Sequence, residues 1–427
     1  MKSFLKFLLV ANIAIVLSFS IMGVGITNVH ANEEKITVPI HTHWWLEEGA
    51  GGFLREVKAA FEKEYPNIII VPVGIPFAEV YDQAFLKLPT QSPPGIIMSD
   101  VGHIGPFIAT GLLTPLNKYV EKDGLLDRIQ PSAIESVKGK DGNLYMIPWQ
   151  LTCEALTYNK EILDSVGVKV PTTLEELLHV ARVTTNQEKR QYGIGLLTTP
   201  SGGRLYNKVW AFVRGLEGNF FVGGQPTLNT PKVIEAIELY KQFVDEGLTP
   251  IGVDERDLRE LFAQGKIAMQ VDLPILQDIA RKLNPKMANN LGIASMPTPN
   301  HRGSLLITTS FFIPKNFAYP DAAYKWLAFI HRPEWVRRFI EISGVATSSV
   351  EPVPEDILSK LPWLEDYQKQ SPYSETSIPE GLAVHFTEIK NIVMNYIQEA
   401  LQGREPVKDV MDRAQNELKQ KVDSWNK

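Results

Sequence analysis

The sequence predicts an α/β protein with two hydrophobic cores. The chain has 427 residues and 44% of them are apolar. Since a single core stops growing at about 250–300 residues, we expect a second one. Strand-like and helix-like stretches alternate near the N-terminus, an order typical of parallel strands joined by right-handed crossovers. The net charge is −6 and no basic stripe is visible, so we expect no nucleic-acid partner.

The N-terminal region predicts a strand, a helix and a second strand. The first strand is expected over residues 35–45, KITVPIHTHWW, and the segment LEEGAGG after it is interpreted as a turn. A helix over 53–65 and a strand over 68–73 follow. Another strand is expected over 95–101. Because open α/β sheets place ligands at the carboxyl ends of parallel strands, these strand ends are candidate site positions.

The middle of the chain contains a strand that leads directly into a helix. Residues 147–163, IPWQLTCEALTYNKEIL, begin with an apolar run, and Asn159 can cap the helix that follows. Polar and aromatic side chains are interleaved in the strand. That pattern suits a strand on the floor of a cleft between two lobes, and it equally suits an edge strand with one wet face.

Residues 1–31 predict a secretory signal peptide. Lys2 and Lys6 form a charged start, residues 7–26 are apolar, and Ala31 is the small residue at the end. A permanent membrane anchor is the alternative, because the apolar run is nearly long enough to span a bilayer. The polar residues that follow favour removal, and no cysteine follows that could carry a lipid. We therefore expect a periplasmic protein that is not lipidated.

Metal and cysteine chemistry are not expected. Cys153 is the single cysteine, so the chain has no internal disulfide and no cysteine-based zinc site. His41, His43 and His103 could meet as a zinc site if the strand ends converge, but no fourth ligand is evident. We predict neither a metal nor a cofactor.

Several short motifs follow one another from about residue 35 to the end of the chain. They include FEKEYPN, GIIMSDVGHIGPFIATGLLTPL, GNLYMIPWQ with EALTYNKEIL, and LFAQGKIAMQVDL. In their number and order the chain resembles the extracellular solute-binding proteins of family 1, the sugar-binding components of ABC importers. The maltose- and glucose-binding proteins belong to this family. Gly95 departs from it where the family usually has Asp, and Leu273 departs where it has Gly.

The resemblance implies a two-lobe periplasmic-binding-protein fold of type II. Each lobe would be a mixed sheet flanked by helices, and several crossings of the chain would form the hinge. Lobe one would comprise residues 32–150 and 309–344, and lobe two residues 151–308 and 345–427.

The same resemblance implies the function. The protein would be a monomer that captures a carbohydrate in the cleft between its lobes and delivers it to the membrane permease subunits of an ABC importer. It would not be an enzyme. One alternative is the same fold with a non-sugar solute such as glycerol phosphate or a polyamine. The other is a secreted glycosidase that pairs Glu47 or Glu48 with Glu154.

Candidate ligand contacts are aromatic rings, which can stack on the C–H face of a sugar, and polar groups that can bond hydroxyls. Aromatic residues at strand or helix spacing are more often core residues, and strand alternation lets only one of the two adjacent tryptophans face a cleft. The candidates are Trp44, Trp45, Glu47, Glu48, Asp100, His103, Gln150, Thr152, Glu154, Trp210, Phe221, Asp272, Phe311 and Trp363.

Overall fold

The computed structural model describes residues 35–425, with the exception of residues 78, 140 and 201–202. The described residues from Ile36 onward form one compact unit. The predicted signal peptide, residues 1–31, lies outside the described residues. Within the described part of the chain, no helix combines the length and the apolar character that a membrane span needs.

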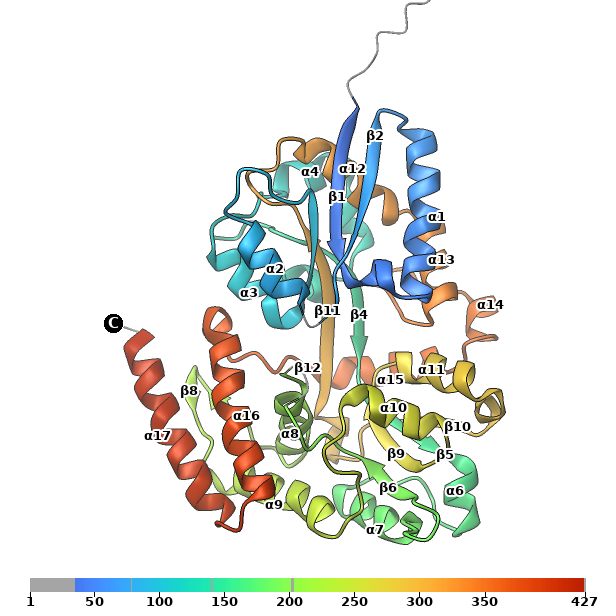
Figure 1. Ribbon diagram of the computed structural model, residues 1–427, viewed down its shortest axis with the longest axis vertical. Helices are drawn as coiled ribbons and strands as arrows, with labels where there is room; N and C mark the ends of the chain where they lie inside the picture. The colour runs from blue at the N-terminus through green and yellow to red at the C-terminus, as the bar shows by residue number, and fades with distance from the viewer. Residues whose placement is uncertain (1–34, 78, 140, 201–202, 426–427) are drawn as a thin grey trace, which may run out of the picture. The chain divides into compact units, whose positions relative to one another are not determined.

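The first lobe is built on a mixed six-stranded sheet. Its strands are β1 (Ile36–Thr42), β2 (Ile68–Gly74), β3 (Ile96–Asp100), β4 (Ile147–Cys153), β11 (Ser304–Phe312) and β12 (Ser374–Glu375). The order is β12-β11-β3-β1-β2, and β4 pairs with β11 outside this path. β1 runs parallel to β2 and β3, whereas β11 runs antiparallel to β3 and β4 (Figure 1).

Helices from distant parts of the chain pack on this sheet. They are η1 (His43–Leu46), α1 (Gly49–Glu64), α2 (Val80–Lys87), α3 (Val101–Ala109), α4 (Asn117–Asp123), η2 (Leu125–Arg128), α5 (Pro131–Glu135), α12 (Pro320–Ile330) and α13 (Pro333–Ser343). The core between them is aromatic. Phe53 of α1 stacks on Trp149 of β4 with ring centroids 5.7 Å apart, and meets Phe339 of α13 edge to face at 5.1 Å.

The second lobe has its own sheet of four strands. They are β5 (Ala155–Asn159), β6 (Tyr192–Gly195), β9 (Ile267–Asp272) and β10 (Leu291–Ala294), in the order β10-β5-β9-β6. A short hairpin, β7 (Phe221–Val222) with β8 (Gln225–Pro226), stands apart from it. β9 is antiparallel to β5 and parallel to β6, so this sheet is also mixed.

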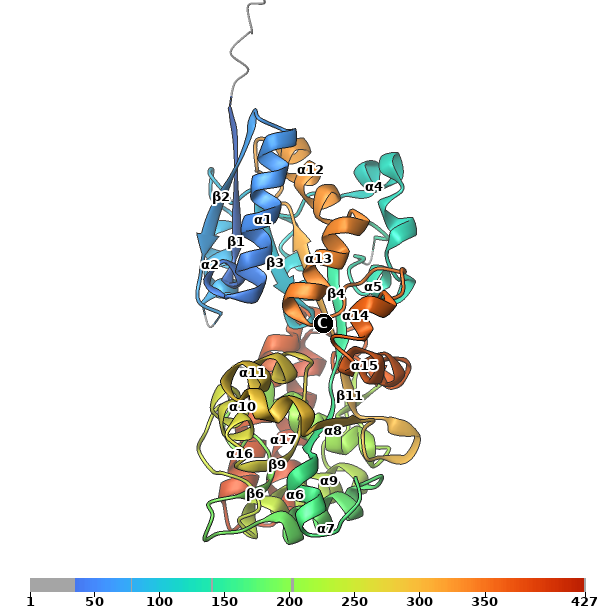
Figure 2. The same ribbon diagram turned by 90° about the vertical axis from the view of Figure 1, so that its right-hand side faces the viewer.

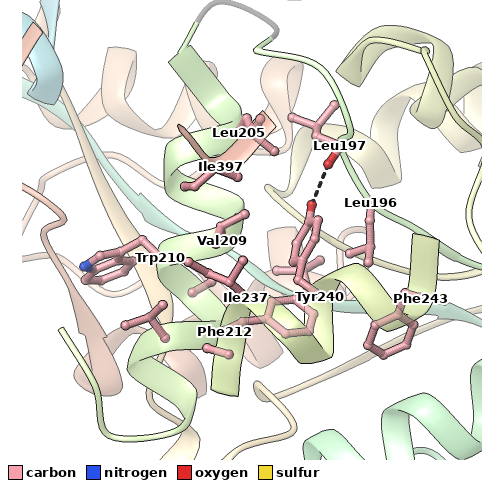
Figure 3. Packing of buried hydrophobic residues seen from close by; sticks show 14 of the residues in the cluster. Leu196, Leu197, Leu205, Val209, Trp210, Phe212, Ile237, Tyr240, Phe243 and Ile397 are labelled. Carbon is pink, nitrogen blue, oxygen red and sulfur yellow. Dashed lines mark hydrogen bonds between the residues drawn. The ribbon is translucent and has the colours of Figure 1, made fainter. Parts of the chain in front are cut away.

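Helices surround the second sheet and supply most of its core. They are α6 (Lys160–Ser165), α7 (Leu174–Thr184), α8 (Arg204–Gly215), α9 (Pro231–Asp245), α10 (Glu255–Ala263), α11 (Ile275–Leu283), η4 (Pro285–Asn289), η5 (Pro299–His301), η7 (Ala383–His385), α16 (Phe386–Gln402) and α17 (Val407–Trp425). Figure 3 shows α8 and α9 packed through residues such as Val209, Phe212 and Ile237, with the Tyr240 hydroxyl donating to the Leu197 carbonyl at 2.8 Å.

Local signals explain where several helices begin. The Asn159 side chain accepts from the Ile162 amide at 3.3 Å and caps α6, as the sequence predicts. Thr173 caps α7 in the same way. At α10, Asp254 and Asp257 form a reciprocal capping box. These bonds satisfy amides that have no partner inside the helix.

The chain passes between the two sheets more than once. β4 belongs to the first sheet and β5 to the second, so the chain changes sheet at Glu154. It returns between β10 and β11, and it leaves again after α13, where Thr347 forms a bridge to Gln150. Beyond this point α14 (Glu355–Leu358) and α15 (Trp363–Gln370) form a third, small apolar cluster with Cys153 and Ile340, and η6 (Ser371–Tyr373) follows α15. The residue boundaries of the lobes stay a prediction.

Two local predictions are wrong. The segment GAGG is not a turn, because Gly49 to Gly52 form the first turn of α1. β1 ends at Thr42, and residues 43–46 form a 3₁₀ turn that replaces the expected strand alternation.

Candidate functional site

Two strands of the first lobe bring polar side chains to one edge of its sheet. β1 and β3 are parallel and end at Thr42 and Asp100, so both carboxyl ends lie at the same edge. The Thr42 hydroxyl accepts from the Trp44 amide at 3.2 Å, and the Asp100 carboxylate accepts from the Gly102 amide at 3.0 Å. Each strand therefore turns directly into a capped helix, η1 or α3.

Asp100 is held as a charged carboxylate. Burial works against its charge, but the hydrogen bond and the charge of His103 and the attraction of Lys390 outweigh burial and lower the pKa of Asp100. The His103 Nδ1 atom lies 2.6 Å from Asp100 Oδ1, and the imidazole stacks on the Tyr81 ring with centroids 3.9 Å apart. The geometry of this group is thus fixed by both charge and stacking.

An exposed phenylalanine beside these strand ends was missed by the sequence analysis. Phe77 follows β2, is 50% exposed, and meets the His43 ring edge to face at 5.0 Å. Burial lowers the pKa of His43 to about 4, although Asp100 partly offsets it, so the imidazole is neutral at pH 7. One sequence feature could have indicated Phe77 as a candidate: it is a large apolar residue in the loop that follows a strand of the parallel sheet.

The lobes touch where α3 meets η7 and α16 (Figure 1). A Cβ atom placed on Gly105 of α3 would lie 2.6 Å from the Ala383 Cβ, and one on Gly102 would lie 3.3 Å from Lys390 Nζ. Burial lowers the pKa of Lys390, while the Asp100 charge opposes that change. We call this group of residues, Gly102, Gly105, Ala383 and Lys390, the contact end.

A buried ion network lies in the second lobe. We use this name for Glu154, Arg204, Lys208, Glu255, Arg259 and Asp272. Lys208 Nζ lies 2.7 Å from Glu154 Oε1, and Arg204 bonds both Glu154 and Glu255 at 3.1 Å. Arg259 lies 2.6 Å from Asp272. Buried charges of this kind persist only because they neutralise one another.

The electrostatics of the network follow from this pairing. Burial raises the pKa of Glu255, but Arg204, Arg259 and Lys208 outweigh burial and hold it well below its usual range. Lys208 also donates to the Val271 carbonyl at 2.8 Å. Each cation of the network thus bridges carboxylates or binds a carbonyl of a second-lobe strand, and the network fixes α8 and α10 to β9.

A hollow of about 300 Å³ lies between the lobes. The first lobe contributes the C-terminal end of α13, with Glu341 and Gly344, and the second lobe contributes α11, with Asp278, Arg281 and Lys282. The start of α15 adds the Trp363 ring. Figure 2 shows α13 above α11 and α15 at this place. We call this space the interlobe hollow; its volume is at the lower end of what small-molecule sites need.

A smaller hollow of about 70 Å³ lies at the hinge. Its walls include Thr152 and Cys153 of β4, Pro274 before α11, and Thr347 after α13. The Cys153 thiol is buried, its Sγ lies 3.4 Å from the Tyr367 carbonyl oxygen, and burial raises its pKa to about 11. The thiol is therefore protonated at pH 7, as expected for an inert cysteine.

Some of the candidate ligand contacts border these spaces. Trp363 lines the interlobe hollow and Thr152 lines the hinge hollow. Asp100 and His103 lie together at the edge of the first sheet. Gln150, on β4, is half-buried and pairs across the sheet with Thr309.

The carboxylates that follow β1 have a different setting. Glu47 and Glu48 are both exposed. The Glu47 carboxylate lies 3.3 Å from His43 Nε2, and partial burial raises its pKa. Glu48 occupies the position before α1 but accepts no capping hydrogen bond.

The other candidates lie inside the lobes. Trp44 and Trp45 are both buried, in contrast to the expectation that one of them faces outward. Trp44 stacks on Phe339 at 5.5 Å and meets Phe311 edge to face at 5.7 Å. Trp45 Nε1 donates to the Ile40 carbonyl at 3.0 Å.

The second-lobe candidates are buried as well. Trp210 and Phe221 belong to the core of that lobe, where Trp210 is visible in Figure 3. Glu154 and Asp272 are fully buried members of the ion network. Within the described residues, no group of three or more His, Cys, Asp or Glu side chains is placed to hold a metal ion.

The two lobes, their mixed sheets and the hollow between them define a protein that can enclose a small molecule. Residues 44–337 match the family of bacterial extracellular solute-binding proteins, and the chain belongs to this family. The family consists of binding proteins rather than enzymes.

Two relatives illustrate the sequence similarity. A candidate binding protein of Brucella abortus is 28% identical over 331 residues, which cover 74% of this chain and 76% of the relative. The melibiose/raffinose/stachyose-binding protein MelE of Bacillus subtilis is 23% identical over 384 residues, 82% of this chain and 84% of MelE.

Solved structures establish the fold. An ABC transporter solute-binding protein of Thermotoga lettingae with bound α-D-tagatose superposes with a TM-score of 0.79 at 20% identity, covering 91% of this chain and 100% of that one. UgpB of Mycobacterium tuberculosis with glycerophosphocholine gives 0.80 at 16% identity, covering 92% and 99%. The chain has the two-lobe periplasmic-binding-protein fold of type II, with a hinge that the chain crosses several times.

Proposed function

We propose that the protein captures a carbohydrate between its lobes and delivers it to the membrane subunits of an ABC importer. The observation that carries this proposal is the interlobe hollow, whose walls come from α13 of one lobe and α11 of the other. The sugars named for MelE and for the Thermotoga lettingae protein support the carbohydrate class. The predicted signal peptide supports action in the periplasm, and we propose that the protein acts there as a monomer.

The lining of the hollow suits a polyhydroxylated solute. Trp363 offers an aromatic ring, on which the C–H groups of a sugar can pack. The Asp278 and Glu341 carboxylates can accept hydrogen bonds from hydroxyls, and such charge-assisted bonds are directional enough to distinguish epimers. Asp100, His103 and Thr152 are our further candidates for solute contacts, and the exposed Glu47 and Glu48 remain candidates too.

Binding in this hollow would favour closure of the lobes. A solute that touches α11 and α13 together gains contacts only while the two helices are close, so it shifts the population toward the closed arrangement. A closed protein also presents one defined surface to the importer. Hydrolysis is less well supported, because Lys208 and Arg204 hold the Glu154 carboxylate that a glycosidase would use.

A titration of tryptophan fluorescence tests the proposal. We expect a saturable change with one or a few members of a panel of mono- and oligosaccharides, and a smaller radius of gyration in solution scattering when that sugar is present. Trp363→Phe should weaken binding, whereas Trp425→Phe, on α17, should not. Saturable binding of glycerophosphodiesters or polyamines, without any response to sugars, would keep the fold but refute the carbohydrate class.

A further inference from the structure

Arg281 differs from the other charged side chains that line the interlobe hollow. Asp278 is paired with Lys282 at 3.0 Å, and Glu341 is paired with Arg337 at 3.0 Å. For Arg281, the described part of the chain provides neither an ion pair nor a hydrogen bond. Its guanidinium carbon lies 4.6 Å from the centroid of the Trp363 ring. The N–H donors of Arg281 therefore remain available at the wall of the hollow.

The stack on Trp363 orients the guanidinium. The Trp363 ring is 8% exposed, and its Nε1 donates to the Gly344 carbonyl at 3.3 Å. Gly344 ends α13 in the left-handed conformation, with a φ of 66°, so the ring is anchored to the first lobe. A cation on an anchored ring keeps its planar set of donors in one place. Less conformational freedom is then lost when a ligand binds the donors.

A planar guanidinium with free donors is the group that binds carboxylate or phosphate through two parallel hydrogen bonds. The two carboxylates of the hollow do not pair with Arg281, because Asp278 is held by Lys282 and Glu341 is held by Arg337. The remaining wall includes Ile342 and Leu361, which suit the C–H surface of a sugar ring. The hollow thus offers an anion site beside an apolar surface and two hydroxyl acceptors.

We propose that the solute is an acidic carbohydrate, with its carboxylate or phosphate group bound by Arg281 and its ring in the interlobe hollow. This inference rests on the proposed function and narrows its substrate class. The anion of the solute would pair with Arg281, for which the described residues provide no ionic partner. Because Arg281 lies on α11 and its Trp363 support is anchored to α13, binding of the anion couples both lobes.

Calorimetric titration with matched solutes tests the inference. The panel contains uronic acids, sugar phosphates and the neutral sugars from which both derive, together with inorganic phosphate. We expect an acidic member to bind about tenfold or more tightly than its neutral parent, since hydrogen bonds to charged groups are worth this much. Tighter binding of a uronate identifies a carboxylate, and tighter binding of a sugar phosphate identifies a phosphate.

The Arg281→Gln variant provides the second arm. It should lose the preference for the acidic solute, so that the acidic solute and its neutral parent bind with about the same affinity. The matched control is Arg256→Gln, because Arg256 is 84% exposed on α10 and lies outside the hollow. This control should keep the preference. The thermal midpoints of both variants should stay near that of the wild type.

Four results would overturn the inference. The first is equal or tighter binding of the neutral parent, which would leave the proposed function intact. The second is an unchanged acidic preference in Arg281→Gln, which would place the anion elsewhere. The third is the absence of binding by every acidic solute; if no neutral sugar binds either, the proposed function fails with it. The fourth is inorganic phosphate that binds as tightly as any sugar phosphate, which would refute a role for the sugar ring.

Discussion

The lobes meet in two different ways at the two places described above. At the contact end, glycines of α3 let its backbone come against η7, and no side chain fits between Gly105 and Ala383. At the interlobe hollow, α11 and α13 stay apart and leave a space of about 300 Å³. The difference separates two tasks. The contact end limits how closely the lobes approach, and in our proposal the hollow provides the space for a solute.

The two places also treat charge differently. Next to the contact end, Arg204 belongs to the buried ion network, where carboxylates hold it. In the hollow, Arg281 has an aromatic ring as its support and no carboxylate partner among the described residues. Arg204 is thus saturated by carboxylates, whereas Arg281 is oriented by a ring and, in our proposal, is left open for the solute. Substitutions at the first should lower stability, and substitutions at the second should lower affinity.

The largest effect is expected from Lys208→Met. This change removes one cation from the buried ion network and leaves the Glu154 charge with Arg204 alone, which should lower the free energy of unfolding by about 3–5 kcal/mol. Urea unfolding measures the loss. The double variant Glu154→Gln with Lys208→Met should recover part of it, because no charge is then left unbalanced. A single variant with less than about 1 kcal/mol of loss would show that the network is not structural.

Gly105→Leu introduces a large side chain at the contact end. A Cβ at this position already lies 2.6 Å from Ala383, so the leucine must push the lobes apart or shift α3. Overpacking of this kind costs about 1–3 kcal/mol, and we expect about a tenfold loss of solute affinity together with a larger radius of gyration. Ala109→Leu, at an exposed position of the same helix, is the control. Unchanged affinity in Gly105→Leu would show that solute binding does not depend on close approach of the lobes at the contact end.

Asp100→Asn should have a smaller and pH-dependent effect. Asn caps helices as well as Asp, so the change removes the charge beside His103 and Lys390 but keeps the cap. Because the pKa of Asp100 is lowered in the folded protein, its charge adds stability above the ordinary Asp pKa of about 4. The contribution is lost as the pH falls below that value.

Thermal unfolding of the wild type and Asp100→Asn across the pH range measures this. The two midpoints should differ at pH 7 and converge as the pH falls below the ordinary Asp pKa of about 4 and Asp100 of the folded protein takes up its proton. The sign follows from weaker proton binding by the folded protein than by the unfolded chain. A difference that does not vary with pH would mean that the charge of Asp100 has no part in the contact between the lobes.

The smallest change in stability is expected for Arg256→Gln, which lies outside both the contact end and the interlobe hollow. Arg256 forms an exposed pair with Glu260 at 3.1 Å, one helical turn away. Such pairs contribute about 0.5 kcal/mol or less, so Arg256→Gln should leave urea unfolding nearly unchanged. A loss as large as that of Lys208→Met would remove the distinction between buried and exposed pairing on which the comparison rests.

Much of the fold could be predicted from local sequence. The apolar spacing of Phe53, Val57 and Phe61 predicts α1, and Asn159 predicts the start of α6, since both depend on residues within a few positions. The burial of both Trp44 and Trp45 could not be predicted from strand alternation. The Thr42 hydroxyl caps a 3₁₀ turn at the Trp44 amide, and in such a turn successive side chains are about 120° apart rather than on opposite faces.

The candidate site was predicted less completely, because it depends on pairing between distant residues. Trp363 was among the candidates and lines the hollow, whereas Arg281 and Lys390 were missed. Glu154 was expected to face a solute, but its partners Arg204 and Lys208, 50 and 54 residues later in the chain, hold it inside the second lobe. No periodicity of a single element indicates such partners. A side chain can be assigned to a site or to a core only after the elements are placed.

The hinge hollow has a practical consequence for solution studies. Cys153 is the single thiol of the chain, and it is buried beside the place where the chain changes sheet. A maleimide or iodoacetamide reagent can therefore attach at one position only, and it can reach that position only when the surrounding residues part. The rate of alkylation, followed by mass spectrometry with and without a sugar, therefore measures how often the hinge opens. No cysteine has to be introduced for this measurement.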